Sequence, residues 1–127
     1  MAIVNLDKVQ ACYSGNLESM VFDTDVTNGV FAHIGGLKEG LVSGDGEVVE
    51  AVVPTAESIA TQEVVLHASP EVNYDPRQAG LQHFKLKAGE IGRGYHLVPG
   101  DMITLTEDLI DGTPVVGEYV IPQAGSM

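Results

Sequence analysis

The side chains best suited to chemistry are four histidines, His33, His67, His83 and His96, and the one cysteine, Cys12. Structural zinc sites hold their ligands at short characteristic spacings, and these residues follow none of them. His33 and His67 stand in apolar stretches, where we expect histidines that are hydrogen-bonded in the core or at a sheet edge. His83 and His96 lie close in sequence to Lys85, Lys87 and Arg93. They are candidates to face a partner.

Motifs that would mark a reaction or an ion site are incomplete. No serine stands in a G-x-S-x-G turn. Gly44-Asp45-Gly46 lacks the spaced acidic ligands of a calcium loop, and Gly92-Arg93-Gly94 lacks the pattern of a phosphate loop. Glu107 and Asp108 are expected at a helix start, where negative charge is favoured. The sequence therefore predicts no enzyme, and no catalytic, cofactor-binding or metal-ligating residue.

Cys12 is expected to be a small buried apolar residue. Nothing near it in the sequence supplies a base that would make it a nucleophile. One cysteine allows no intrachain disulfide, so the chain does not depend on an oxidising compartment.

The segment MAIVNLDKVQ lacks the positive region and apolar run of a signal peptide. No stretch approaches the roughly 20 apolar residues that cross a bilayer. These features predict a soluble protein made in the cytoplasm.

The charge balance is strongly acidic. Eighteen Asp and Glu residues outweigh six Lys and Arg residues, for a formal net charge of −12. Such a surface repels nucleic acids and anionic membranes, because phosphates are bound by clustered Lys and Arg. It also keeps a protein soluble at high concentration. We expect no nucleic acid and no membrane as a partner, whereas a basic protein, or a neutral one bound through strand pairing, remains open.

Length and composition predict one all-β domain. A chain of 127 residues is most simply one domain, and it can bury a core without disulfides or metals. Fifteen Gly and six Pro are spread along a chain rich in Val and Ile, which is typical of many short strands and turns. With no Trp, three Phe and four Tyr, the core is expected to be mostly aliphatic.

Apolar runs bounded by turn residues predict about seven to nine short strands, in a small barrel or sandwich. Asn28-Gly29 predicts a tight hairpin, since both residues accept positive φ, and Gly35-Gly36 is expected to end the strand that follows. Residues 55–61, with Thr55 as a cap, and residues 106–110 predict one or two helical turns. The expected strands cover residues 20–26, 30–34, 47–53, 63–68, 81–86, 91–98, 102–105 and 115–121.

The ends of the chain are expected to differ from the β domain at residues 16–122. Residues 1–15 are either an extended N-terminal arm, ordered on a partner, or a first strand. Residues 123–127 are expected to be a flexible tail. The loop at residues 69–80 is long enough to be a contact loop.

A basic segment stands out from the acidic background. Four of the six cationic residues, Arg77, Lys85, Lys87 and Arg93, fall close together, with Tyr74 and Tyr95 beside them in the sequence. Arg and Tyr are enriched at the centres of protein interfaces. Two interpretations stay open: a contact surface between subunits, or solvated charges that balance neighbouring acids.

Three groups of residues, in this order, resemble the small head decoration (cement) proteins of tailed bacteriophages. They are Asn28-Gly29 with Phe31, the run LHASPEVNY at residues 66–74, and the run KAGEIGRGYHLVPGD at residues 87–101. The resemblance covers about residues 20 to 110. The Ala88-Gly89-Glu90, Leu97 and Gly100-Asp101 pattern is also similar to β-clip domains, which occur in enzymes and in pilus and sugar-binding proteins.

The resemblance to decoration proteins implies a compact β fold of β-tulip or β-clip-like form with an N-terminal arm. It implies a homotrimer on the surface of the expanded capsid, bound to the major capsid protein and bridging neighbouring shell subunits. The arm would include Ile3, Val4 and Leu6, which could add a strand to a sheet edge of the shell protein. The family has no catalytic residue and no cofactor to carry over.

Two other functions remain open at the level of the sequence. One is a carbohydrate- or receptor-binding β module, against which the lack of Trp argues mildly. The other is a β-clip domain of a small enzyme. Of these functions, we expect that of a capsid decoration protein. The residues expected to contact the capsid or a neighbouring subunit are Ile3, Val4, Leu6, Tyr74, Arg77, Lys85, Lys87, Arg93 and Tyr95.

Overall fold

The computed structural model describes residues 3–9, 16–39, 47–71, 77 and 83–123. Within these ranges, short strands carry the architecture, and the helices with described bounds are short: α1 (Ser58–Thr61) and a 3-10 helix (Glu107–Leu109). The strands are β1 (Val4–Lys8), β2 (Leu17–Val21), β3 (Phe31–Leu37), β4 (Val48–Val52), β5 (Val65–His67), β6 (Ile91–Tyr95) and β7 (Met102–Leu105).

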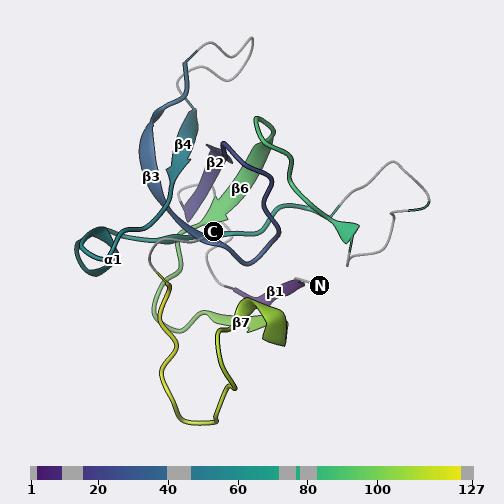
Figure 1. The fold of residues 1–127 in the computed structure, drawn as a ribbon, viewed down its shortest axis with the longest axis vertical. Coiled ribbons are helices and arrows are strands. Elements are labelled where there is room, and N and C mark those ends of the chain that lie inside the picture. The colour runs from purple at the N-terminus through teal and green to yellow at the C-terminus, as the bar shows by residue number, and fades with distance from the viewer. Residues whose placement is uncertain (1–2, 10–15, 40–46, 72–76, 78–82, 124–127) are drawn as a thin grey trace.

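Five of these strands close into a barrel in the order β2-β4-β3-β5-β6, with β6 returning to β2. The pair β2-β4 is parallel and the other pairs are antiparallel. Figure 1 shows β3, β4, β2 and β6 side by side around the barrel axis. Closure leaves no open edge on these strands, so the barrel itself is not a template for pairing with another chain.

Mostly aliphatic side chains, together with the Phe22 ring, fill the interior of the barrel. Its core cluster consists of Met20, Phe22, Val26, Ala32, Val49, Val65 and Leu86. Strand β6 approaches this core through glycine: a Cβ at Gly94 would collide with the Met20 sulfur and lie 3.4 Å from a Val65 methyl group. The β6 pattern alternates exposed side chains with buried glycines, as expected where a small barrel needs close backbone approach.

Two histidines belong to the core, as the sequence predicts. His67 is fully buried and its ring stands edge-on to Phe22, with centroids 5.0 Å apart. The His33 ring bonds through Nδ1 to the Glu63 carbonyl at 2.8 Å and through Nε2 to Ser58 Oγ at 2.8 Å. Both side chains are therefore buried and hydrogen-bonded within the domain.

A second, two-stranded sheet lies outside the barrel, below it in Figure 1, where β1 pairs antiparallel with β7. Its register sets Val4 opposite Leu105. Ile3 extends the pairing, because its carbonyl accepts the Thr106 N–H at 3.1 Å and its own N–H donates to Thr106 Oγ1 at 3.0 Å. Of the two alternatives for the N-terminal segment, residues 4–8 thus form a strand paired within the chain; residues 10–15 lie outside the described residues.

The predicted fold class is confirmed: the protein is a small all-β domain with a closed five-stranded barrel and very little helix. The predicted hairpin at Asn28-Gly29 is wrong, because β2 pairs with β4 and β6 and not with β3. Only Gly29 has positive φ there, at +95°. The Gly29 N–H instead donates a hydrogen bond to the His67 carbonyl at 2.9 Å. The turn therefore contacts β5 and does not join two paired strands.

Three further strand predictions need correction. Strand β3 continues through Gly35-Gly36 to Leu37, with a register shift against β4 after Ile34, as a β-bulge produces. In the predicted strand at 81–86, the described residues contribute a single bridge, Leu86 to Val26. Residues 115–121 form no strand, and their β-branched side chains are exposed; propensity alone does not make a strand without a neighbour to pair with.

Gly29 is the point where the second sheet meets the barrel. A Cβ at this position would collide with Leu109 and come within 3.2 Å of a Val4 methyl group. We expect Gly29→Ala to lower the free energy of unfolding by about 3 kcal/mol, since backbone strain and overpacking add. Urea unfolding measures this loss.

Gly89→Ala is the matched control for Gly29→Ala. Gly89 also has positive φ, at +82°, but nothing lies within 4 Å of its Cβ position, so only the strain of about 1 kcal/mol is expected. Equal losses in the two variants would contradict a close contact at Gly29.

Candidate functional site

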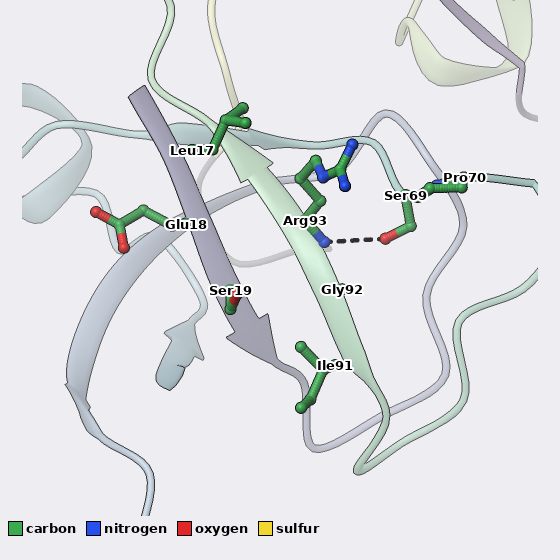
Figure 2. A pocket seen from close by; sticks show the side chains of 8 residues that line it. All are labelled: Leu17, Glu18, Ser19, Ser69, Pro70, Ile91, Gly92 and Arg93. Carbon is green, nitrogen blue, oxygen red and sulfur yellow. Dashed lines mark hydrogen bonds between the residues drawn. The ribbon is translucent and has the colours of Figure 1, made fainter. Parts of the chain in front are cut away.

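A hollow on the barrel wall lies between β2, β6 and the turn after β5, with a volume of about 320 Å³ (Figure 2). Strands β2 and β6 form its floor in antiparallel register, with Ser19 opposite Arg93. The lining residues are Leu17, Glu18, Ser19, Ser69, Pro70, Ile91, Gly92 and Arg93. The hollow is a shallow surface depression of mixed polarity.

The charged side chains at this hollow do not converge. Figure 2 shows Glu18 on one side of β2 and Arg93 on the far side of β6, next to Ser69. An active site brings a nucleophile, a base and a stabilising group to within reach of one reacting atom. The positions of Glu18 and Arg93 do not provide that geometry.

Ser69, which lines this hollow, forms a Ser–His pair with His67. The Ser69 hydroxyl lies 2.8 Å from His67 Nε2, and His67 Nδ1 lies 3.0 Å from the Thr27 carbonyl. Burial lowers the pKa of His67, and this outweighs the opposing effect of the hydrogen bond to Thr27. The ring is thus neutral near pH 7, with Nδ1–H donating to Thr27 and Nε2 accepting the Ser69 proton.

A neutral histidine that accepts a serine proton is the arrangement of an activated nucleophile, but Ser69 is held as a structural residue. Its oxygen also accepts the Arg93 N–H at 3.0 Å, and the residue is only 9% exposed. Asn28 binds its backbone from both directions, accepting the Ser69 N–H and donating to the Ser69 carbonyl, each at 2.9 Å. These bonds tie the end of β5 to β6 and to the turn at Asn28.

His96, directly after β6, joins the carboxylates of Glu18 and Glu63. Its Nδ1 lies 2.9 Å from Glu63 and its Nε2 lies 3.1 Å from Glu18. Partial burial lowers the pKa of His96, but the hydrogen bonds to Glu63 and Glu18 and the charges of both carboxylates raise it, and the net shift is upward. Only the protonated ring can donate to both acids, so this cluster is an ion-paired link between β2 and the segment that leads into β5.

The expected contact residues fall on two separate surfaces. Strand β6 carries Arg93 and Tyr95 on its outer side, and Lys85 and Lys87 are exposed in the segment before it. Ile3, Val4 and Leu6 are half-buried at the second sheet. Arg77 is exposed, and Tyr74 lies outside the described residues. The structure thus does not bring these residues together into one patch, and their contact role stays a prediction.

A set of exposed apolar residues near the C-terminus was missed by the sequence reasoning. The sequence predicts a strand for the run VVGEYVI, and a strand paired in a sheet would bury part of its apolar side chains. In the structure five of these side chains are exposed: Val115, Val116, Tyr119, Val120 and Ile121. The Pro residues on both sides and the central Gly of this run were the available sign that it is not a regular strand.

Among the described residues, no group of three or more His, Cys, Asp or Glu side chains is placed to bind a metal ion. In the same part of the chain, no helix has the length and apolar character needed to span a membrane. No protein-family model, curated protein or solved structure matches this chain.

The structural role of Ser69 is tested by Ser69→Ala. The change leaves His67 Nε2 and the Arg93 N–H without their shared partner, and we expect unfolding to become easier by about 2 kcal/mol. Ser19→Ala is the control, because Ser19 lines the same hollow but an effect within about 0.5 kcal/mol is expected at such a position. Hydrolysis of an activated ester that disappears in Ser69→Ala and persists in Ser19→Ala would show instead that Ser69 is a nucleophile.

The His96 cluster predicts a pH-dependent stability. Because folding raises the pKa of His96 above its ordinary value of 6.5, the stabilisation is complete below that value and is lost as pH rises through the higher pKa of the folded state. We expect the stability difference between the wild type and His96→Gln to shrink as pH increases from about 6 to 9. A difference that stays constant over this range would mean that His96 does not act as the charged link.

Proposed function

We propose that this chain is a capsid decoration (cement) protein, which binds the shell of a phage head and stabilises it by bridging neighbouring capsid subunits. In this proposal the protein acts as a homotrimer on the virion surface, with the major capsid protein as its partner. The starting point is the resemblance carried by residues 66–74 and 87–101.

The observation that carries the proposal is the contrast between a filled barrel and an apolar surface segment. The barrel interior is occupied by its own side chains, so it offers no chamber for a small ligand. Five large apolar side chains between Val115 and Ile121 are instead exposed to solvent. Contiguous exposed apolar groups on a small domain favour contact with another protein.

The electrostatics are consistent with a protein that is used in many copies. A net charge of −12 keeps free molecules apart in solution. Several weak contacts per oligomer then combine into tight binding on a repetitive shell, because each bound subunit raises the effective concentration of the next. The exposed cationic residues Lys85, Lys87 and Arg93 provide basic points on this acidic surface.

The proposal is tested by mixing the purified protein with expanded heads of the phage that carries this gene, prepared without it. We expect the protein to sediment with the heads and to raise the temperature at which they release DNA. Arg93→Glu is expected to weaken binding about tenfold. Lys38→Glu, which reverses a charge at the end of β3 where Lys38 lies 3.4 Å from Glu50, serves as the control.

Failure of the wild-type protein to sediment with the heads would refute the proposal. Equal losses for Arg93→Glu and Lys38→Glu would indicate general charge repulsion and not a contact on β6. Selective binding on a glycan array, with no binding to heads, would assign the chain to the carbohydrate-binding class instead.

A further inference from the structure

The Asn28-Gly29 pair, which forms no hairpin in this fold, has a chemical reactivity of its own. When glycine follows asparagine, the glycine backbone nitrogen can attack the asparagine side-chain carbon Cγ, because glycine has no Cβ to obstruct the approach. The chain has four asparagines, and the residues that follow the other three are Leu6, Leu17 and Tyr74. The sequence therefore favours this reaction at Asn28.

The reaction has two steps and needs only water. In the first, the Gly29 nitrogen forms a bond to Asn28 Cγ and gives up its proton, the bond from Cγ to Nδ2 breaks, and ammonia leaves with that proton. The product is a cyclic imide. In the second, water adds to one of the two imide carbonyl groups and the C–N bond at that carbonyl breaks. One choice gives aspartate, and the other gives isoaspartate, whose main chain is longer by one methylene group.

In the folded domain, both groups that the first step consumes are hydrogen-bonded. The Gly29 N–H donates to the His67 carbonyl at 2.9 Å. Asn28 Nδ2 donates to the Ser69 carbonyl at 2.9 Å and to Glu71 Oε1 at 3.3 Å. Asn28 is also only 2% exposed. Ring closure would break these three bonds in a site closed to water, so the fold opposes the reaction.

We propose that Asn28 is a self-modification site, which is blocked in the folded domain and is converted to aspartate or isoaspartate when the turn at residues 27–29 opens. The substrate is the side-chain amide of the chain itself, and ammonia is the leaving group. Opening breaks the bonds to His67 and Ser69, so that the Gly29 nitrogen and the Asn28 amide can meet. The rate of modification therefore follows the fraction of molecules in the open state.

The products do not fit the site that the amide occupied. Aspartate has an oxygen in place of Nδ2, so an acceptor would face the Ser69 carbonyl and the Glu71 carboxylate where a donor is required. A buried mismatch of this kind is destabilising. Isoaspartate lengthens the main chain next to Gly29, where a Cβ would already collide with Leu109. Each opening thus carries a risk of irreversible loss of stability.

The inference is independent of the proposed function, because it is tested on the isolated protein. Wild-type protein is incubated at mildly alkaline pH, folded in buffer and unfolded in guanidinium chloride, and is then digested with trypsin. Mass spectrometry measures aspartate and isoaspartate in the fragment that contains both Asn16 and Asn28. We expect modification of Asn28 to be at least about tenfold slower in the folded protein, and Asn16, which precedes Leu17, to react little in either sample. Equal rates at Asn28 would overturn the inference.

Ser69→Ala and Ser19→Ala test whether opening controls the rate. Ser69→Ala weakens the junction of β5 with β6, since the Ser69 hydroxyl bonds to His67 and to the Arg93 N–H. We expect it to speed the modification of Asn28 in buffer about tenfold, with Ser19→Ala unchanged and all rates equal in guanidinium chloride. An unchanged rate in a destabilised Ser69→Ala protein would mean that the reaction needs no opening, and the inference would be wrong.

Asn28→Asp places the aspartate product in the chain directly. We expect this variant to unfold at a much lower urea concentration than the wild type, or to fail to fold. Asn5→Asp is the matched control, because it makes the same charge change at an exposed residue whose Oδ1 accepts the Asp7 N–H at 2.9 Å, a bond that a carboxylate keeps. Equal urea midpoints for the two variants would refute the claim that modification removes stability.

The isoaspartate product is tested in the wild type. After incubation in guanidinium chloride, the protein is refolded by dilution, and the refolded and unfolded fractions are separated by size. We expect isoaspartate at Asn28 to be enriched in the unfolded fraction. Its even distribution between the fractions would contradict an effect of the modification on refolding.

Discussion

The close approach of β6 to the buried side chains of its neighbouring strands, β2 and β5, is the constraint on which the structure depends. A barrel of five strands has little interior volume, and Met20, Phe22 and Leu86 already fill it. Strand β6 can close the ring only because Gly92 and Gly94 present no side chain to His67 and Met20. Close packing in protein interiors leaves no room for an added methyl group at such points, so the buried hydrogen bonds around Ser69 depend on the same glycines.

Hydrogen bonds between polar side chains hold the strands in the arrangement that Gly92 and Gly94 allow. His67, Ser69 and Asn28 exchange hydrogen bonds across the seam between β5, β6 and the turn at residues 27–29, and His96 links β2 to Glu63. In the described part of the chain, no buried side-chain nitrogen or oxygen lacks a partner. Such networks specify one arrangement of the strands, because a half-satisfied alternative costs more than an apolar one.

The fold class could be read from the sequence, and the details that failed share a physical cause. Short apolar runs located β4, β5, β6 and β7, and the apolar surroundings of His33 and His67 indicated histidines of the core. Local sequence does not specify which strands pair with each other. Asn28-Gly29 has the composition of a hairpin turn, but the Gly29 N–H bonds to His67 of β5. The run at residues 115–121 failed for the converse reason, since exposure depends on neighbours that local propensity does not specify. The contact surfaces remain predictions because binding partners leave no periodic pattern in the sequence.

The pairing of strands distant in sequence has a consequence for biosynthesis. Leu17 aligns with Tyr95 in the barrel, and Val4 aligns with Leu105 in the second sheet. Neither sheet can be completed until most of the chain has left the ribosome, and topologies of such high contact order fold slowly. During that delay nascent apolar segments are exposed to one another, as in other slow-folding β proteins. The surplus of carboxylates distributed along the polypeptide would then act before folding, by keeping unfinished chains apart.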